Sequence, residues 1–318
     1  VPFSALGVVL AIGIVFGDIG TSPLYVMKAI LNALPEGQLS RPEYIVGAVS
    51  CVIWTLTIQT TLKYVIITLR ADNKGEGGIL SLYALIRQKY RWAYILAGVG
   101  AATLLADGII TPAMTVMSAV EGLNTIAPHI PVIPVTVAIV LVLFLVQPFG
   151  TGSIGKYFGP LMIIWFTMMF VMGLTQVTTD LSVLRAFNPM YAIHFLIEVP
   201  QTMIMLGAIF LCTTGAEALY SDLGHTGLKN IRISWIYVKT ALIVNYLGQA
   251  AWIINSHNVT PKTNPFFAMM PTWFTFAGVV MATLAAIIAS QALISGSFTV
   301  ISEAISLNIW PNVKIQYP

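Results

Sequence analysis

Long apolar runs are the feature that most constrains what this 318-residue chain can fold into. They reach the length of about 20 residues that a helix needs to cross a hydrocarbon core ~30 Å thick. Hydrophobic residues make up 57% of the chain and charged residues 8%, whereas an average soluble domain has about 25% charged residues. This composition excludes a soluble enzyme. Because a backbone in lipid must satisfy its own hydrogen bonds, we predict an all-α polytopic membrane protein.

About eight transmembrane helices are predicted from these runs. Their ranges are 2–34, 43–69, 92–126, 131–148, 156–177, 200–223, 231–254 and 271–303. Lys and Arg favour cytoplasmic loops, and nine of these residues fall on one side of the predicted topology against three on the other. We therefore expect a multi-pass protein of the cell (plasma) membrane with a cytoplasmic N-terminus. The segment 79–89 is predicted to lie on the cytoplasmic interface, and 181–199 to be an external connector.

Several classes of function find no support in the residues. The net charge of +3 is too small and too scattered for a nucleic-acid binder. Cys51 and Cys212 both lie in apolar runs, so neither a disulfide framework nor a zinc site is expected. No Ser/His/Asp or Cys/His arrangement stands out, and the glycines of 75–78 lack the Lys-Ser/Thr of a nucleotide-binding loop. We expect neither an enzyme nor a bound cofactor.

The first polar site within a predicted span is the segment 17–25 (GDIGTSPLY). Pro23 removes a backbone donor and clashes with the carbonyl one turn earlier. Unwound backbone at membrane depth is tolerated only where it faces protein or a watery cavity, and a buried acid such as Asp18 points to function. Side-chain oxygens are also offered by Thr21, Ser22 and Tyr25. With the freed carbonyls they would suit a hard cation, although a simple proline kink is the alternative.

A second interruption is predicted in the sixth span, where 213–222 (TTGAEALYSD) combines Gly, an acid and hydroxyl groups. The first and sixth spans run in opposite directions, and each carries an acid, Asp18 or Glu217, followed by Leu-Tyr. Paired interrupted helices at corresponding positions are typical of an inverted-repeat transporter site. We therefore expect helices 1 and 6 to be broken, near 18–23 and 214–218, and to face a common cavity. Chance similarity of a few residues is the alternative.

The third span carries a polar stripe along one face. Its members follow one another in steps of four or three, which keeps them on one side of a helix with 3.6 residues per turn; they are Asp107, Thr111, Met114, Ser118 and Glu121. A stripe flanked by apolar residues must face the bundle interior, although Glu121 could simply stay solvated near the outer interface. Asn245 and Gln249 in the seventh span are interpreted as packing contacts between helices.

Several longer motifs run along the whole chain. They are 17–25, 71–78 (ADNKGEGG), 107–113 (DGIITPA) with 118–122 (SAVEG), 214–220 (TGAEALY), 245–249 (NYLGQ), 264–268 (NPFFA) and 289–296 (ASQALISG). In these motifs the sequence resembles the KUP (KUP/HAK/KT) family of potassium uptake transporters, within the amino acid–polyamine–organocation superfamily. The resemblance implies a LeuT-like inverted-repeat fold and a secondary active transporter that couples potassium import to proton entry (K+/H+ symport).

The resemblance also implies roles for individual residues. Asp18 and Tyr25 match the ion and proton site of the first helix, Glu121 matches the acid of the third helix, and Thr214 and Glu217 match the contribution of the sixth. On that basis proton coupling is expected at Asp18 and Glu121, where the proton and the cation compete to neutralise Asp18. Potassium binding is expected at Asp18, Thr21, Tyr25, Thr214 and Glu217, with a pathway along Asp107, Thr111 and Ser118.

The implied fold divides the chain into two parts. Residues 1–177 would form the first five-helix repeat (spans 1–5), and 178–318 a connector with an incomplete second repeat (spans 6–8). Family members typically continue through about four more helices to a cytoplasmic domain that often dimerises. We expect that part, and any homodimer through it, to lie beyond Pro318. The expected partners are the potassium ion, protons and the lipid bilayer, with no nucleic acid.

Two rival functions remain. An amino-acid permease would use the same LeuT-like fold, with the glycines of the first helix binding the substrate carboxylate. Asp18 argues against it, because an acid at that position would repel a carboxylate and attract a cation. A potassium channel would need a repeated carbonyl filter motif such as Thr-Val-Gly-Tyr-Gly, which the sequence does not contain.

Overall fold

A computed structural model of the chain describes residues 3–35, 37, 41–73, 75–90, 92–127, 129–147, 155–256, 259–307 and 309–311. These residues form helices joined by turns and loops, and no β-strand is found among them. One isolated bridge joins Asn73 to Glu76. The all-α class predicted from the composition is therefore confirmed.

The helices are of very different lengths. The long ones are α3 (Pro42–Thr55), α5 (Ala93–Glu121), α6 (Val132–Val146), α7 (Gly155–Val177), α12 (Leu228–Asn255) and α14 (Thr272–Ser306). The short α-helices are α1 (Ala5–Ile14), α2 (Val26–Ala33), α4 (Ile79–Ile86), α8 (Pro189–Glu198), α9 (Thr202–Phe210), α10 (Ala218–Ser221), α11 (Leu223–Thr226) and α13 (Pro265–Ala268). The tighter 3-10 helices are η1 (Ile19–Leu24), η4 (Thr68–Arg70), η5 (Gly122–Thr125), η7 (Leu181–Phe187) and η8 (Leu211–Thr213). The wider π-helix is η3 (Leu56–Ile67).

Among the described residues, five helical stretches are long and apolar enough to cross a membrane. They are Pro42–Arg70, Ala93–Thr125, Tyr157–Val177, Thr202–Ser221 and Thr272–Ser306, and each overlaps a predicted span. The chain is thus a multi-pass membrane protein. The predicted fourth span is shorter than expected, because α6 has 15 residues and a length of ~22 Å. The predicted seventh span lies in α12, whose 28 residues include Lys229, Arg232 and Lys239. With these charges, composition alone does not identify α12 as a membrane-spanning helix.

The first predicted span is divided into three helical pieces. α1 ends at Ile14, η1 covers Ile19–Leu24 with Pro23 inside it, and α2 begins at Val26. Proline has no amide hydrogen to donate, which is consistent with a change of helix type at this point. Every residue of η1 is buried. Asp18 lies at the start of η1, deep in the bundle.

The segment 202–221 is divided in a similar way. α9 ends at Phe210, η8 follows it, and α10 begins at Ala218. Between η8 and α10, Gly215 has a φ of 87°, a left-handed conformation that only glycine adopts without steric cost. A Cβ at Gly215 would also lie 2.7 Å from the Cβ of Asp18. Glycine at this position therefore lets the two divided segments touch, and η1 and η8 are in contact.

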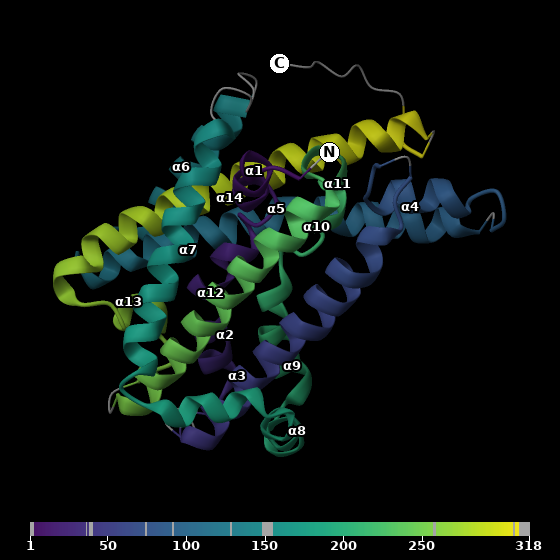
Figure 1. The fold of residues 1–318 in the computed structure, drawn as a ribbon. Coiled ribbons are helices and arrows are strands. Elements are labelled where there is room, and N and C mark those ends of the chain that lie inside the picture. The colour runs from purple at the N-terminus through teal and green to yellow at the C-terminus, as the bar shows by residue number, and fades with distance from the viewer. Residues whose placement is uncertain are drawn as a thin grey trace.

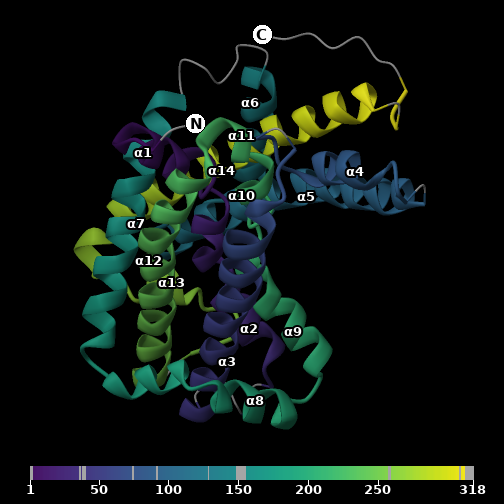
Figure 2. The same ribbon diagram turned by 45° about the vertical axis from the view of Figure 1, so that its right-hand side comes forward.

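α12 lies beside α7, and α1 packs against both (Figure 1). α7 and α12 approach closely at Gly173 and Gly248, where a Cβ on Gly248 would lie 2.5 Å from the Cα of Gly173. Aromatic side chains fill the surrounding core, for example Phe16 stacked on Trp235 with ring centroids 5.8 Å apart. α3 packs against α8 and η7, which lie across one end of the bundle (Figure 2).

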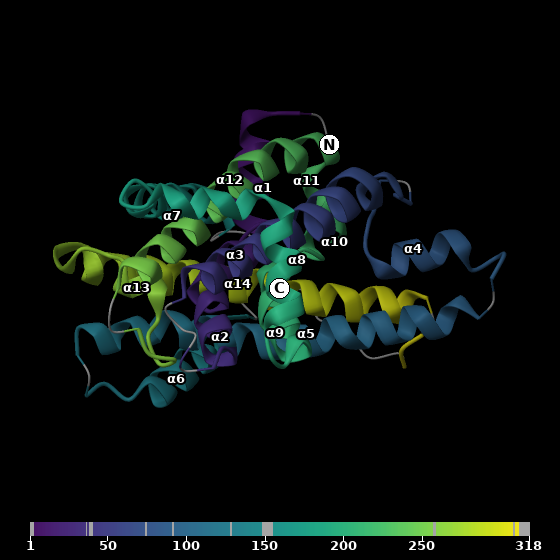
Figure 3. The same cartoon turned by 90° about the horizontal axis from the view of Figure 1, so that it is seen from below.

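α5 and α14 lie side by side and extend away from this bundle (Figures 2 and 3). α4 packs on the first turns of α5. Buried residues of these three helices form a second, smaller apolar cluster, which includes Leu80, Ala97, Ala101, Val300 and Ala304. The polar stripe of α5 therefore reaches from this extension into the main bundle.

The close contact of α7 and α12 gives a first prediction. Gly248→Ala should lower the melting temperature in detergent, because the added methyl group overpacks the helix contact, a change that typically costs 1–3 kcal/mol, roughly. Gly98→Ala is the matched control, since Gly98 is also helical and a Cβ there would meet nothing within 4 Å. It should be neutral or stabilising, because alanine favours helix over glycine. Equal effects of the two substitutions would contradict this account of the packing.

Candidate functional site

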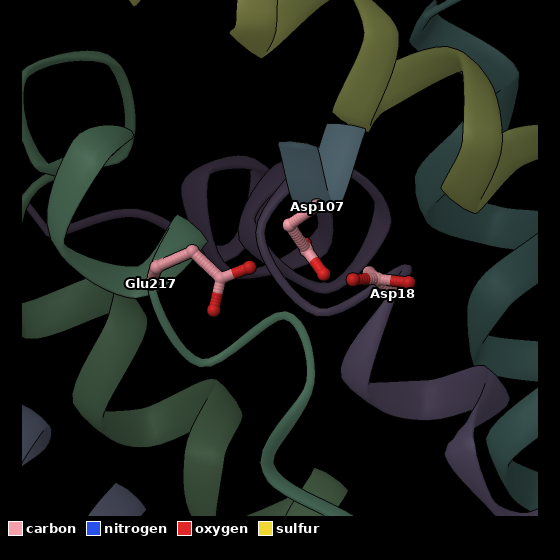
Figure 4. A group of neighbouring side chains, drawn as sticks. All are labelled: Asp18, Asp107 and Glu217. Carbon is pink, nitrogen blue, oxygen red and sulfur yellow. The ribbon is translucent and has the colours of Figure 1, made fainter. Parts of the chain in front are cut away.

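Three acidic side chains from three separate segments point toward one another (Figure 4). Asp18 lies just before η1, Asp107 in α5, and Glu217 just before α10. One carboxylate oxygen from each lies within 4.8 Å of those from the other two. Asp18 is only 5% exposed, and the other two are partly buried. We refer to these three residues as the acid cluster.

The acid cluster cannot carry three negative charges without compensation. Two unit charges 4.8 Å apart repel each other by about 3.5 kcal/mol at an effective dielectric constant of ~20. Three such pairs add up to about 10 kcal/mol, which is comparable to the whole stability of a typical domain. The cluster must therefore hold protons, bound cations or both in every stable state. This is the arrangement expected of a site where a cation and a proton replace each other.

Two carboxylate oxygens of the acid cluster lack a hydrogen-bond partner among the described residues. Asp18 Oδ2 and Asp107 Oδ2 are buried and accept no hydrogen bond from the described residues. The other oxygen of Asp107 accepts a hydrogen bond of 2.7 Å from the Thr111 hydroxyl. Because buried polar groups nearly always have a partner, the two free oxygens favour a bound cation or proton.

Hydroxyl groups lie beside the acids. The Tyr25 hydroxyl is 3.3 Å from the Ser22 hydroxyl and lies near the side chain of Thr214. Tyr25 follows η1 and Thr214 follows η8, so the two divided segments each contribute an acid and a hydroxyl. Thr21 is different, because its hydroxyl donates to the backbone carbonyl of Asp18 at 2.8 Å.

A cavity of about 750 Å³ leads to the acid cluster. Asp107 and Glu217 line it together with residues of η3, α4 and α9, among them Gln59, Lys63 and Leu82. A smaller cavity of about 40 Å³ reaches both Asp18 and Glu217 from the side of α14. The cluster thus lies where the larger cavity meets the closed interior of the bundle.

Glu121 lies apart from the acid cluster. It forms an ion pair with Lys28, with Nζ and Oε2 2.6 Å apart and both side chains about one-fifth exposed (23% and 21%). Lys28 on α2 and Glu121 at the end of α5 therefore tie these two helices together. No sequence pattern singles out Lys28, and the role of Glu121 in proton coupling stays a prediction.

The remaining stripe residues face inward. Thr111 and Ser118 are buried at 5% and 6% exposure. Thr115, which lies one turn after Thr111, is also buried, and its hydroxyl has no partner among the described residues. Thr115 is not among the residues predicted for the stripe, although its spacing of four from Thr111 places it near the same helix face. Asp107 was expected along the pathway, and the structure places it in the acid cluster itself.

The backbone carbonyls of η1 differ from the expectation. They were expected to offer oxygen to an ion, but three of them accept hydrogen bonds from side chains elsewhere in the bundle. The Trp165 indole donates to the Gly20 carbonyl, the Gln249 amide to that of Pro23 and the Asn264 amide to that of Leu24. The unwound backbone at this depth is thus satisfied by protein, as it must be in a membrane.

A family model described as the K+ potassium transporter integral membrane domain matches residues 5–318. The chain belongs to this family. Among similar proteins of the potassium transporter family, the probable potassium transport system protein Kup of Cytophaga hutchinsonii is 56% identical over 320 residues, covering 99% of this chain and 48% of that protein. The protein of the same name from Enterococcus faecalis is 52% identical, covering 99% of this chain and 50% of its own length. The chain spans about half the length of the curated relatives it matches. No solved structure matches it.

The Lys28–Glu121 ion pair gives a second prediction. Lys28→Met should lower the melting temperature in detergent, because it leaves Glu121 partly buried without its counter-charge; the expected cost is about 1–2 kcal/mol, between that of surface and buried pairs. The double variant Lys28→Met with Glu121→Gln should recover part of this loss, and Glu121→Gln alone completes the cycle. Additive effects of the two substitutions would mean that the pair contributes nothing to stability.

Proposed function

We propose that the chain forms the ion-binding part of a transporter that carries potassium across the plasma membrane. The observation that supports this most directly is the acid cluster, in which three acids from three segments converge inside an apolar bundle. Membership of the potassium transporter family agrees with this reading. The relatives are named as potassium transport proteins, and we extend that substrate to this chain.

The ion is bound by the acid cluster together with Tyr25 and Thr214. Carboxylate and hydroxyl oxygens replace the loosely held water of a potassium ion at small cost. One positive ion does not balance three ionised acids, so the cluster also carries protons when the ion is bound. Potassium binding at Asp18 and Glu217 is thereby linked to the proton content of the cluster, which is the basis of a K+/H+ symport.

Asp18 is the principal acid for proton coupling, because it lies deepest and one of its oxygens is free. Glu121 is the second candidate. Protonation of Glu121 would weaken its ion pair with Lys28 and so loosen α2 from α5. Asp107, Thr111 and Ser118 line the route between these two acids along one face of α5.

The fold is a LeuT-like inverted repeat, with 1–177 as the first repeat and 178–318 as a connector with part of the second. Two features support this assignment. Both α1–η1–α2 and α9–η8–α10 are divided at their acidic residue, and η1 and η8 meet. Divided helices that meet at a midplane site are typical of such transporters.

The N-terminus lies in the cytoplasm and the large cavity opens on that side. The excess of Lys and Arg on the side of the 70–91 loop supports this orientation. Along α5, the residues that line the cavity, such as Gly100 and Thr103, precede Asp107, whereas the ion-paired Glu121 follows it. The structure then corresponds to an inward-facing state, open to the cytoplasm and closed by the Lys28–Glu121 pair on the outer side.

An amino-acid permease of the same fold is the rival function. Three acids within 4.8 Å would repel the carboxylate of an amino acid, and no observation favours it. Rubidium uptake into proteoliposomes that contain the full-length protein separates the two functions. We expect uptake that rises with an inward proton gradient and falls with added potassium. Uptake of amino acids with no rubidium flux would reject the proposal.

Asp18→Asn should abolish accumulation driven by the proton gradient and leave the melting temperature close to that of the wild type. The amide cannot exchange a proton, and its shape fits the same space. Glu198→Gln is the control, because Glu198 is an exposed acid on α8, outside the cluster. Concentrative rubidium uptake by Asp18→Asn at the wild-type level would refute the role of Asp18.

Glu217→Gln should raise the KM for rubidium about tenfold, which corresponds to ~1.4 kcal/mol of lost binding. Tyr25→Phe should have a smaller effect, because its hydroxyl is one neutral ligand among several. The measurement is the concentration dependence of rubidium uptake for each variant. An unchanged KM in both Glu217→Gln and Thr214→Ala would show that the ion binds elsewhere.

A further inference from the structure

Three side chains outside the acid cluster hold the interrupted first segment by its backbone. We propose that Gln249, Trp165 and Asn264 are positioning residues, which fix η1 and thereby set the affinity of the Asp18 site for its cation. This inference rests on the proposed function and extends it to residues that do not touch the ion. Gln249 and Asn264 belong to the motifs 245–249 and 264–268, which the proposed function leaves without a role.

The three donors reach η1 from three different elements. Trp165 lies on α7 and donates its indole N–H to the Gly20 carbonyl at 2.9 Å. Gln249 lies on α12 and donates its amide N–H to the Pro23 carbonyl at 3.1 Å. Asn264 lies just before α13 and donates to the Leu24 carbonyl at 3.0 Å. Bonds from three directions fix both the position and the rotation of a segment, which one bond could not do.

These bonds take the place of a regular helical ladder. In an α-helix each of these carbonyls would accept the N–H four residues later. A buried carbonyl without any partner destabilises the fold, so the three donors are needed to keep η1 in this shape. Asp18 directly precedes η1, and its carboxylate therefore moves whenever η1 moves.

Further hydrogen bonds fix the orientation of the Gln249 side chain. Its amide nitrogen also donates to Asn245 Oδ1 at 2.9 Å, and Asn245 in turn donates to the Met169 carbonyl at 3.1 Å. Both side chains are fully buried. The sequence alone predicts Asn245 and Gln249 to be packing contacts between helices. A packing contact needs no amide group, whereas this pair connects the backbone of α7 to that of η1.

The occupied carbonyls also limit what the cation can use as ligands. With the carbonyls of Gly20, Pro23 and Leu24 engaged, the ion depends on carboxylate and hydroxyl oxygens. Loss of one donor would both shift Asp18 and release a carbonyl oxygen near the site. The preference of the site among alkali cations should then change along with its affinity, an effect that a merely structural role in holding helices together would not produce.

The test compares Gln249→Leu and Trp165→Phe in full-length protein with the control Gln176→Leu. The side-chain amide of Gln176 on α7 donates an equivalent hydrogen bond of 2.9 Å, but to the Met269 carbonyl, which is not part of η1. Trp165→Phe removes the N–H donor and part of the buried ring volume, and keeps an aromatic ring against Phe266, whose centroid is 5.5 Å from that of Trp165. The readouts are the KM for rubidium, inhibition by potassium, caesium and sodium, and the rise in melting temperature caused by potassium chloride.

We expect the KM for rubidium to rise about tenfold in Gln249→Leu and less in Trp165→Phe. Both variants should show a changed order of inhibition by the competing cations and a smaller potassium-dependent rise in melting temperature. Gln176→Leu should keep the wild-type KM and cation order, even if its melting temperature without potassium falls as much as theirs.

Wild-type KM and cation order in Trp165→Phe would overturn the inference, whether or not Gln249→Leu folds. Wild-type protein that is stabilised by potassium but takes up no rubidium would refute transport, and the melting data would still decide the role of the positioning residues. Wild-type protein with neither response would overturn both, since there would be no cation affinity to set.

Discussion

Like charges held together in an apolar bundle govern the rest of this structure. The carboxylate oxygens of Asp18, Asp107 and Glu217 lie within 4.8 Å of one another, and their mutual repulsion is too large for the fold to sustain unaided. Such a cluster is stable only when positive charge compensates it, and its presence indicates a function that needs acids at this place. A cation that enters and leaves, with protons in its place when it is absent, meets both requirements, which is why the proposed symport follows from the cluster rather than from any single residue.

The fold is arranged so that the three acids can meet. Two of them lie where helices are divided, and the third lies in the continuous helix α5. The left-handed backbone of Gly215 lets the second divided segment approach within van der Waals contact of Asp18. Dividing a helix also leaves backbone carbonyls without their helical hydrogen-bond donors. For η1, side chains of α7 and α12 donate hydrogen bonds to these carbonyls instead. The long packed contact between α7 and α12 gives those donors a rigid base.

Much of this could be predicted from the sequence, for identifiable reasons. Apolar length predicts the spans, and Pro23 with its glycines predicts where the first one is interrupted. Periodicity places Asp107 on one face of its helix but cannot say which segment that face meets, so its place beside Glu217 was not foreseen. The partner of Gln249 is a carbonyl 226 residues away, and no local pattern reveals such a bond. Lys28 was missed for the same reason, since its partner Glu121 is 93 residues away.

The two sides of the acid cluster are unequal, and this bears on how an ion would pass. On α5, the residues lining the large cavity come before Asp107, while Glu121 lies fourteen residues after it, or ~21 Å along the helix. On the first segment, Lys28 likewise follows Asp18, beyond Tyr25. An ion at the cluster would thus have the large cavity on one side and the Lys28–Glu121 ion pair on the other. α2 and α5 share one apolar core and are joined in addition by this pair of charges, so neutralising one charge would remove one of the contacts that hold them together. In the proposed cycle, opening of the outer side would therefore begin at Lys28 and Glu121, and closing of the inner side at the cavity wall that carries Glu217.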